Sequence, residues 1–152
     1  MVDIAIRPAT IQDIRALAEM GLALLDNPEV DEPELYSLVI DLVNAISNPK
    51  QLVLVALDNE RPIGTLQFRI HPDGNVEALG FYVLPEYRNR GIGPLLIKNA
   101  LTYIEALDGK TKMIISTYLD NPIRKSIGKL GFEPLLTIYS APLEVVRERM
   151  IK

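Results

Sequence analysis

The chain has 152 residues, 48% hydrophobic and 24% charged, which predicts one globular domain over residues 1–152 and excludes disordered, collagen-like and low-complexity proteins. Its formal charge of −4 argues against a broad surface for nucleic acid or acidic lipid. Without cysteine, and with a single histidine, it can form no disulfide or thiolate nucleophile, and we expect no metal site. No secretory signal pattern or membrane-length apolar run is present, so we predict a cytoplasmic protein without membrane or nucleic-acid partners.

The first half of the chain predicts a strand, two helices and a strand hairpin. Thr10, followed three residues later by Asp13, indicates a capping box at the start of the first helix. Asn59–Pro62 has the composition of a turn between two strand-like segments. The predicted elements are strand 3–7, helix 14–22, helix 33–46, strand 51–57 and strand 63–71.

The second half alternates strands with helices, after a turn at Pro72–Asn75. The predicted elements are strand 76–83, helix 91–107, strand 113–118, a short helix from Asn121 to Gly131, strand 135–139 and a carboxy-terminal helix from Pro142. The expected fold is therefore mixed α/β, with helices flanking a central, mostly antiparallel sheet in the order β-α-α-β-β-β-α-β-α-β.

The segment Val83–Leu96 combines the end of a strand, two glycines and the start of a helix. A helix amino terminus offers unpaired N–H groups and a positive dipole, which suit a pyrophosphate. Gly91 and Gly93 would let a phosphate approach the backbone closely, and Arg88 and Arg90 add positive charge. The plainer alternative is a tight strand-to-helix turn with solvated arginines.

The pattern R-x-x-G-x-G from Arg88 to Gly93, preceded by V-x-P, resembles the acetyl-CoA motif of the GNAT superfamily of N-acetyltransferases. Asn121 and Gly131-Phe132 also stand where members of that family place an Asn and a Gly-Phe pair. The predicted element order follows the family, so the resemblance covers nearly all of the chain. It implies the GNAT fold and transfer of acetyl from acetyl-CoA directly to a primary amine of a small molecule or protein.

The resemblance also implies where acetyl-CoA would bind, namely between strands 76–83 and 113–118. The backbone of Phe81–Val83 would pair with pantetheine, the pyrophosphate would lie on Asn89–Gly93, and Asn121 would hold the pantetheine arm. Asn121 has an equally good alternative as a plain cap of the helix that follows it. The implied cofactor-binding residues are Phe81, Tyr82, Val83, Arg88, Asn89, Arg90, Gly91, Ile92, Gly93 and Asn121.

The general acid is where the chain departs from the family pattern. Many members have a Tyr on the helix before Gly-Phe, and the aligned residue here is Ile127. Tyr118, at the end of the preceding predicted strand, is the substitute that we predict to protonate the CoA thiolate. Its alternative is an ordinary strand aromatic.

For the general base, Glu77 occupies the strand position of the catalytic glutamate in the histone-acetyltransferase branch of the family. We expect Leu79, Phe81 and Val83 on the same strand face to desolvate this carboxylate and raise its pKa. The alternative is an exposed acid at a strand start. His71 could also accept the proton, although its place on a polar face beside a turn is typical of a surface histidine.

An acetyl-CoA-dependent N-acetyltransferase is the leading hypothesis. A non-catalytic CoA-binding regulatory module is the alternative that Ile127 favours, and an interaction domain with a coincidental loop is a third. The acidic segment Asp26–Glu34 predicts a small cationic amine as acceptor, against the alternative of a solvated loop. Oligomeric state stays open, a homodimer being common in the family.

Overall fold

The structure is a computed structural model that describes residues 3–24, 32–104, 112–115, 128–129, 131, 133–134 and 141–150. It contains two compact units, residues 1–116 and 117–152. The first unit carries the sheet and three helices, and the second carries the helix α5 (Leu143–Met150). The predicted carboxy-terminal helix is thus confirmed. In the described part of the chain, no helix is long and apolar enough to cross a membrane.

The first unit is built on a five-stranded sheet whose strands follow one another in chain order, β1-β2-β3-β4-β5. The first four strands pair antiparallel and β5 pairs parallel to β4, which confirms the predicted mixed, mostly antiparallel sheet. The strands are β1 (Ile4–Pro8), β2 (Gln51–Asp58), β3 (Arg61–Ile70), β4 (Val76–Val83) and β5 (Met113–Ile115). The apolar run of β2 lies between β1 and β3 and is buried over its five residues from Val53 to Leu57.

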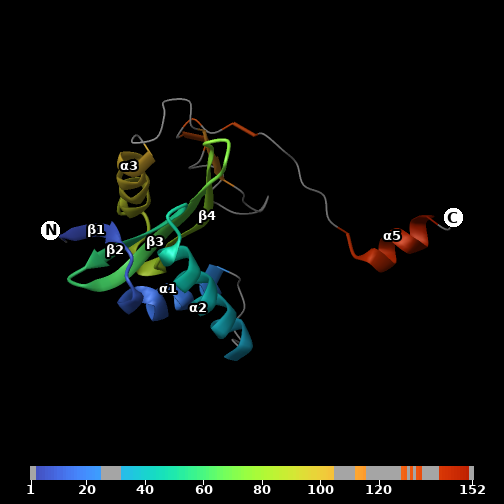
Figure 1. The fold of residues 1–152 in the computed structure, drawn as a ribbon, viewed down its shortest axis with the longest axis horizontal. Coiled ribbons are helices and arrows are strands. Elements are labelled where there is room, and N and C mark those ends of the chain that lie inside the picture. Colours follow the sequence, from blue (N-terminus) through green and yellow to red (C-terminus); the bar gives the residue numbers. More distant parts are fainter. Residues whose placement is uncertain are drawn as a thin grey trace. The chain divides into compact units, whose positions relative to one another are not determined.

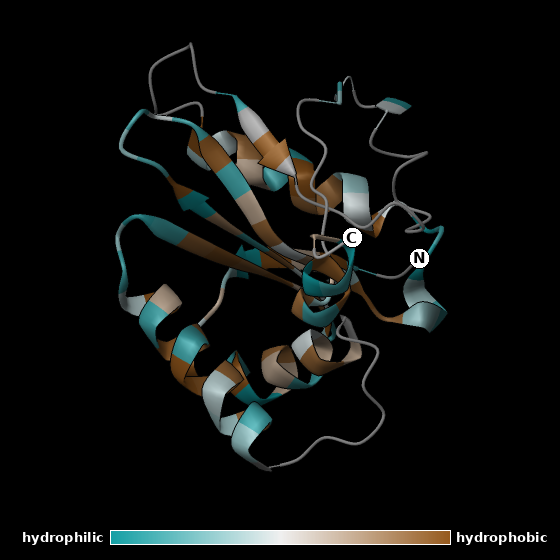
Figure 2. Ribbon diagram, turned by 90° about the vertical axis from the view of Figure 1, so that its right-hand side faces the viewer, coloured by the Kyte–Doolittle hydropathy of each residue, from teal (hydrophilic) through white to brown (hydrophobic). Residues whose placement is uncertain are grey.

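Helices cover both faces of this sheet (Figure 1). α1 (Ile14–Leu24) and α2 (Glu32–Ser47) pack on one face over Val53, Val55 and Tyr82. α3 (Ile92–Ile104) packs on the other face over Phe68 and Leu66. Each helix turns an apolar stripe to the sheet, as Figure 2 shows by the alternation of hydrophobic and hydrophilic residues along them.

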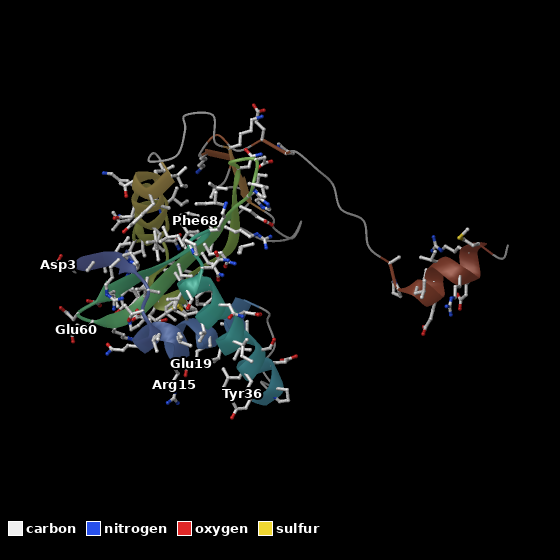
Figure 3. All side chains as sticks on the ribbon, viewed as in Figure 1. Asp3, Arg15, Glu19, Tyr36, Glu60 and Phe68 are labelled. Carbon is white, nitrogen blue, oxygen red and sulfur yellow. The ribbon has the colours of Figure 1, made fainter. Side chains whose placement is uncertain are left out.

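The interior is mainly apolar, and among the described charged residues only Asp13 is buried. Phe68 is fully buried near the centre of the sheet, whereas Arg15, Glu19, Tyr36 and Glu60 point away from the body of the protein (Figure 3). The two cores on opposite faces of the sheet therefore hold the first unit together mainly by hydrophobic burial.

A β-bulge interrupts β4 and changes which of its side chains share a face. Gln67 of β3 is paired with Gly80 and Phe68 with Ala78, so Leu79 is the extra residue without a partner. A single extra residue reverses the alternation of side chains beyond it. Phe81 and Val83 consequently pack against the α3 core, whereas Tyr82 packs against the α1–α2 core. The prediction that Glu77 shares a face with Phe81 and Val83 was therefore wrong.

Four predicted elements extend into or lie within parts of the chain outside the described residues. They are the end of the helix 91–107, the end of the strand 113–118, most of the short helix from Asn121 to Gly131, and the strand 135–139. The elements from β1 to the start of β5 have the predicted order.

The predicted capping arrangement at the start of α1 is present and includes an ion pair. The carboxylate of Asp13 accepts hydrogen bonds from the backbone N–H of Thr10 at 2.8 Å and from both terminal nitrogens of Arg7 at 2.7 and 3.1 Å. The Asp13 side chain is 6% exposed and that of Arg7 is 43% exposed. Burial alone would raise the pKa of Asp13, but the hydrogen bonds from Arg7 and Thr10 outweigh it and lower that pKa.

We expect Asp13→Asn to lower the free energy of unfolding by about 1–2 kcal/mol, because Arg7 loses its charged acceptor while remaining partly screened by water. The pKa of Asp13 is lower in the folded state, so the contribution is present above the ordinary carboxyl range and disappears as pH falls through the folded-state pKa. Urea denaturation at several pH values should show the difference between parental and variant protein shrinking below about pH 4. The exposed pair Arg15–Glu19 provides the control, since Glu19→Gln should cost less than about 0.5 kcal/mol. An Asp13→Asn effect that persists unchanged at low pH would contradict the expectation.

Candidate active site

The loop between β4 and α3 presents backbone N–H groups toward solvent. It begins with a 3₁₀ turn at Pro85–Tyr87, and Asn89 and Gly91 then adopt left-handed conformations, with φ of 60° and 79°. Within the described residues, no hydrogen bond uses the N–H groups of Asn89, Arg90 or Gly91. The first N–H groups of α3, at Ile92 and Gly93, continue this row because a helix start has no preceding carbonyls for them. Such a row, at the positive end of a helix, can bind an anion.

Gly91 meets the steric requirement that an anion imposes on this loop. A Cβ atom built on Gly91 has no other atom within 4 Å, so the space beside its backbone is open. Its φ of 79° is one that residues with side chains rarely adopt. An anion could therefore approach the backbone at Gly91 without a steric clash, which the predicted pyrophosphate site on Asn89–Gly93 requires.

Gly93 has a different structural role from Gly91. A Cβ atom on Gly93 would lie 2.9 Å from Cζ of Phe81, closer than real contacts allow. The absence of a side chain therefore lets the first turn of α3 rest directly on the Phe81 ring. The plain packing alternative accounts for Gly93, whereas the anion-binding interpretation accounts for Gly91.

Arg88 is held against the end of β4. Its Nε donates to the carbonyl oxygen of Val83 at 2.9 Å, and its guanidinium lies 5.3 Å from the centre of the Tyr82 ring. These contacts leave its terminal N–H groups without a partner among the described residues. Arg88 thus fixes the loop to the strand and also places a positive charge beside the N–H row.

Among the described residues, the edge of β4 that faces away from β3 has no strand partner beyond the bulge. The described pairing between β4 and β5 ends at Ala78 and Ile115. Leu84 donates its N–H to Ile63, and antiparallel pairing alternates residue by residue. The backbone groups of Tyr82 therefore face β3, and those of Phe81 and Val83 face away from it. Of the three predicted pantetheine partners, Phe81 and Val83 have backbone groups on this edge.

Tyr87 anchors the loop to the β2–β3 turn, a contact that sequence reasoning missed. Its hydroxyl donates to Oδ2 of Asp58 at 2.7 Å, and this hydrogen bond raises the pKa of Tyr87. Arg61 and Arg90 lie over the ring, at 5.8 and 5.5 Å from its centre. Twenty-nine residues separate Tyr87 from Asp58, and no local pattern signals a pair so far apart.

We expect Tyr87→Phe to weaken acetyl-CoA binding about three- to tenfold, because the loop loses its hydrogen bond to Asp58 while the ring remains. Isothermal titration calorimetry on the folded variant measures this change. Tyr103→Phe, on the exposed side of α3, is the matched control and should leave the affinity unchanged. Equal affinities for the Tyr87 variant and the parental protein would show that the anchor does not hold the loop.

A pocket with a mixed apolar and polar lining lies on the other face of the sheet, between α1, α2 and strands β2 to β4. Its volume is about 400 Å³, and its lining includes the bulge at Leu79 and Gly80. Leu79 is 41% exposed because the bulge removes it from the ladder. The polar side chains that line the pocket are Asp41, Asn44, Gln51, Thr65, Gln67 and Arg69. Only the alternation in β3 hinted at this polar row in the sequence.

Glu77 lies beside this pocket, paired with two basic side chains. Its Oε2 is 2.7 Å from Nη2 of Arg69 and 2.7 Å from Nε2 of His71. Arg69 stands directly opposite Glu77 in the β3–β4 register. The hydrogen bond from Arg69, followed by that from His71, lowers the pKa of Glu77. The expectation of a raised pKa was therefore wrong, because the bulge removes Phe81 and Val83 from its face and two donors stabilise the carboxylate.

The predicted site residues thus form two groups in the described structure. Phe81, Val83, Arg88 and the segment Asn89–Gly93 meet where β4 ends, and Glu77 stands at the start of the same strand. Tyr118 and Asn121 lie outside the described residues, as does Ile127.

One comparison with known proteins identifies a family. The model of the acetyltransferase (GNAT) family matches residues 17–132. No curated protein matches the sequence.

Solved structures share the fold at low sequence identity. Aminoglycoside N-acetyltransferase AAC(6')-Iy in complex with CoA has a TM-score of 0.77 and 18% identity, over 93% of this chain and 95% of that one. The PaiA N-acetyltransferase from Thermoplasma acidophilum, in complex with coenzyme A, has a TM-score of 0.67 and 23% identity, over 85% and 88%. A structure described as a transcriptional regulator from Bacillus halodurans C-125 has a TM-score of 0.75 and 19% identity, over 93% and 100%.

Proposed function

The chain belongs to the GNAT family of acetyltransferases, and on that premise we propose that it transfers the acetyl group of acetyl-CoA to a primary amine. The observation that carries this proposal is the open row of N–H groups from Asn89 to Gly93, at the end of a strand whose outward edge has no strand partner there in the described part of the chain. Because the matched residues extend from 17 to 132, we also propose that both compact units belong to one acetyltransferase domain.

Acetyl-CoA supplies the activated acetyl group, and this chain would hold it at three places. The row Asn89–Gly93 would bind the pyrophosphate through backbone N–H groups, beside the positive charges of Arg88 and Arg90. The outward backbone groups of Phe81 and the N–H of Val83 would pair with pantetheine, the Val83 carbonyl being bonded to Arg88, and Asn121 would assist there. Pantetheine, bound in an extended form along β4, would form the same kind of backbone hydrogen bonds that another strand would form there.

The amine acceptor would enter through the pocket beside the bulge. There the amine nitrogen bonds to the acetyl carbon as the thioester bond breaks; the amine loses one proton and the CoA thiolate gains one. Glu77 is our proposed base, acting directly or through a water, and Tyr118 or solvent would protonate the thiolate. Since its pKa is lowered, Glu77 is ionised throughout the neutral range.

A screen for release of CoA thiol across a panel of amines tests the proposal. The chain has no cysteine, so a thiol reagent reports CoA without background from the protein. We expect thiol release that depends on both acetyl-CoA and an amine, with the acetylated amine detected by mass spectrometry. Binding of acetyl-CoA without turnover on any amine would favour a regulatory CoA-binding module instead, and failure to bind CoA would exclude both.

A further inference from the structure

The pocket beside the bulge carries one positive and one negative side chain on opposite walls. Arg69 lies on β3 and Asp41 on α2, and no other charged residue lines the pocket among the described residues. The amides of Gln51 and Gln67 also line the pocket, and their side chains are hydrogen-bonded at 3.4 Å. Arg69 is paired with Glu77, and Asp41 has no partner among the described residues, so the pocket presents a partly used cation and a free carboxylate to a ligand.

Arg69 has hydrogen-bonding capacity left for a ligand. Its side chain is 45% exposed, and only its Nη2 bonds to Glu77 in the described structure. A guanidinium has five N–H donors in a fixed planar arrangement, which suits a carboxylate. Glu77 contacts Arg69 through Oε2 alone, the oxygen that also contacts His71, so the pair is not bidentate and leaves donors of Arg69 for a ligand.

The pairing with Glu77 also fixes where the guanidinium points. Glu77 stands opposite Arg69 in the register and is 24% exposed, so the Arg69 side chain is held across two strands rather than free in solvent. A charged group already held in its binding position loses less entropy when a ligand arrives. Arg69 is therefore a preorganised binding group for an anion on the wall of the pocket.

We propose that the amine acceptor carries a carboxylate that Arg69 binds, with Asp41 attracting the cationic end of the same molecule. The acceptor class is a compact zwitterion, that is, an amino acid, and a pocket of about 400 Å³ accommodates one. This inference rests on the proposed acetyltransferase function. It differs from the expectation of a cationic amine drawn by Asp26–Glu34, most of which lies outside the described residues.

The test compares α-amino acids with their carboxamides, which keep the amine and lose the negative charge. Each pair in the thiol-release assay consists of an amino acid and its carboxamide. For the pair that the parental enzyme uses best, we expect kcat/KM to be at least about tenfold higher for the amino acid than for the carboxamide. Arg69→Gln should remove this preference by raising KM for the acid while leaving KM for the carboxamide within about twofold. Arg69→Lys should restore part of the preference, because it keeps the charge but not the planar donors.

Two further variants separate a binding role from a structural one. Asp41→Asn should raise KM for both members of a pair alike, since both carry the amine. Arg15→Gln, 92% exposed on α1, should change neither value. Thermal unfolding of each variant identifies any that has lost its fold.

The inference is overturned if the parental enzyme prefers the carboxamide, or if Arg69→Gln changes acid and carboxamide equally. Either result would leave the proposed acetyltransferase function standing. Bound acetyl-CoA with no thiol release from any acceptor would instead contradict the proposed function itself.

Discussion

Gly91→Val should abolish measurable binding of acetyl-CoA, with a loss of at least about 100-fold in affinity. The added side chain would occupy the open space beside the Gly91 backbone, where no protein atom lies within 4 Å and where we place the pyrophosphate. A helix amino terminus binds a phosphate through close backbone contacts, which a branched side chain prevents. Calorimetry with acetyl-CoA and with CoA measures the loss.

The chain offers a matched control for this substitution at Gly74. Both glycines have positive φ, 79° at Gly91 and 85° at Gly74, and neither has an atom within 4 Å of a built Cβ. Valine therefore imposes similar backbone strain at both positions, but Gly74 lies in the turn between β3 and β4, away from the loop. Gly74→Val should bind acetyl-CoA like the parental protein. Undiminished affinity in the Gly91 variant would overturn the assignment of the loop.

Glu77→Gln should lower kcat by about 100-fold or more while leaving acetyl-CoA affinity nearly intact. Positioned proton transfer contributes about 10² to 10⁴ in rate, and glutamine keeps the shape of the side chain without its basicity. Steady-state kinetics with saturating acetyl-CoA measures the change. His71→Gln is the control, since it removes a neighbour of the carboxylate without removing the carboxylate itself.

The pH dependence of kcat provides a second test of the role of Glu77. Because the pKa of Glu77 is lowered, its protonation would reduce kcat only below the ordinary carboxyl range, and the rate should be independent of Glu77 protonation from about pH 5 upward. An acidic limb near neutrality would belong to another group. Parental kcat in Glu77→Gln would show that the base lies elsewhere or that the amine arrives deprotonated, with the protein contributing positioning.

Glu77→Gln also distinguishes a general base from a residue that only positions Arg69. If Glu77 removes the proton, kcat falls equally for an amino acid and for its carboxamide. If Glu77 only holds Arg69, the main change is a higher KM for the amino acid. The two effects can be measured in one set of assays.

The sequence was informative wherever local pattern decides structure. The alternation of Leu66 and Phe68 with polar neighbours predicted β3, and Thr10 with Asp13 predicted the capping contacts of α1. The loop from Arg88 to Gly93 stood out because its arginine and its two glycines lie within six consecutive residues at a predicted strand-to-helix junction. In each case the physical requirement acts over a few residues.

The structural features that the sequence did not predict depend on contacts between residues that are far apart in the chain. Gly80 is a weak sign of a bulge in the segment Val76–Val83, but the register with β3 decides that Leu79 is the extra residue. The lowered pKa of Glu77 follows from that register, because it places Arg69 opposite the carboxylate. The hydrogen bond from Tyr87 to Asp58 likewise needs the hairpin to be formed first.

The bulge adds one residue to β4 without changing the partners of the residues that follow it. Deleting Leu79 would restore a regular ladder and leave Phe81 opposite Leu66 and Tyr82 opposite Thr65, each on its present face. The pocket would lose the Leu79 side chain from its lining, whereas Phe81 would stay against Gly93. A homologous chain that is one residue shorter at this point of β4 should accordingly keep the packing of α3 and differ mainly in the pocket.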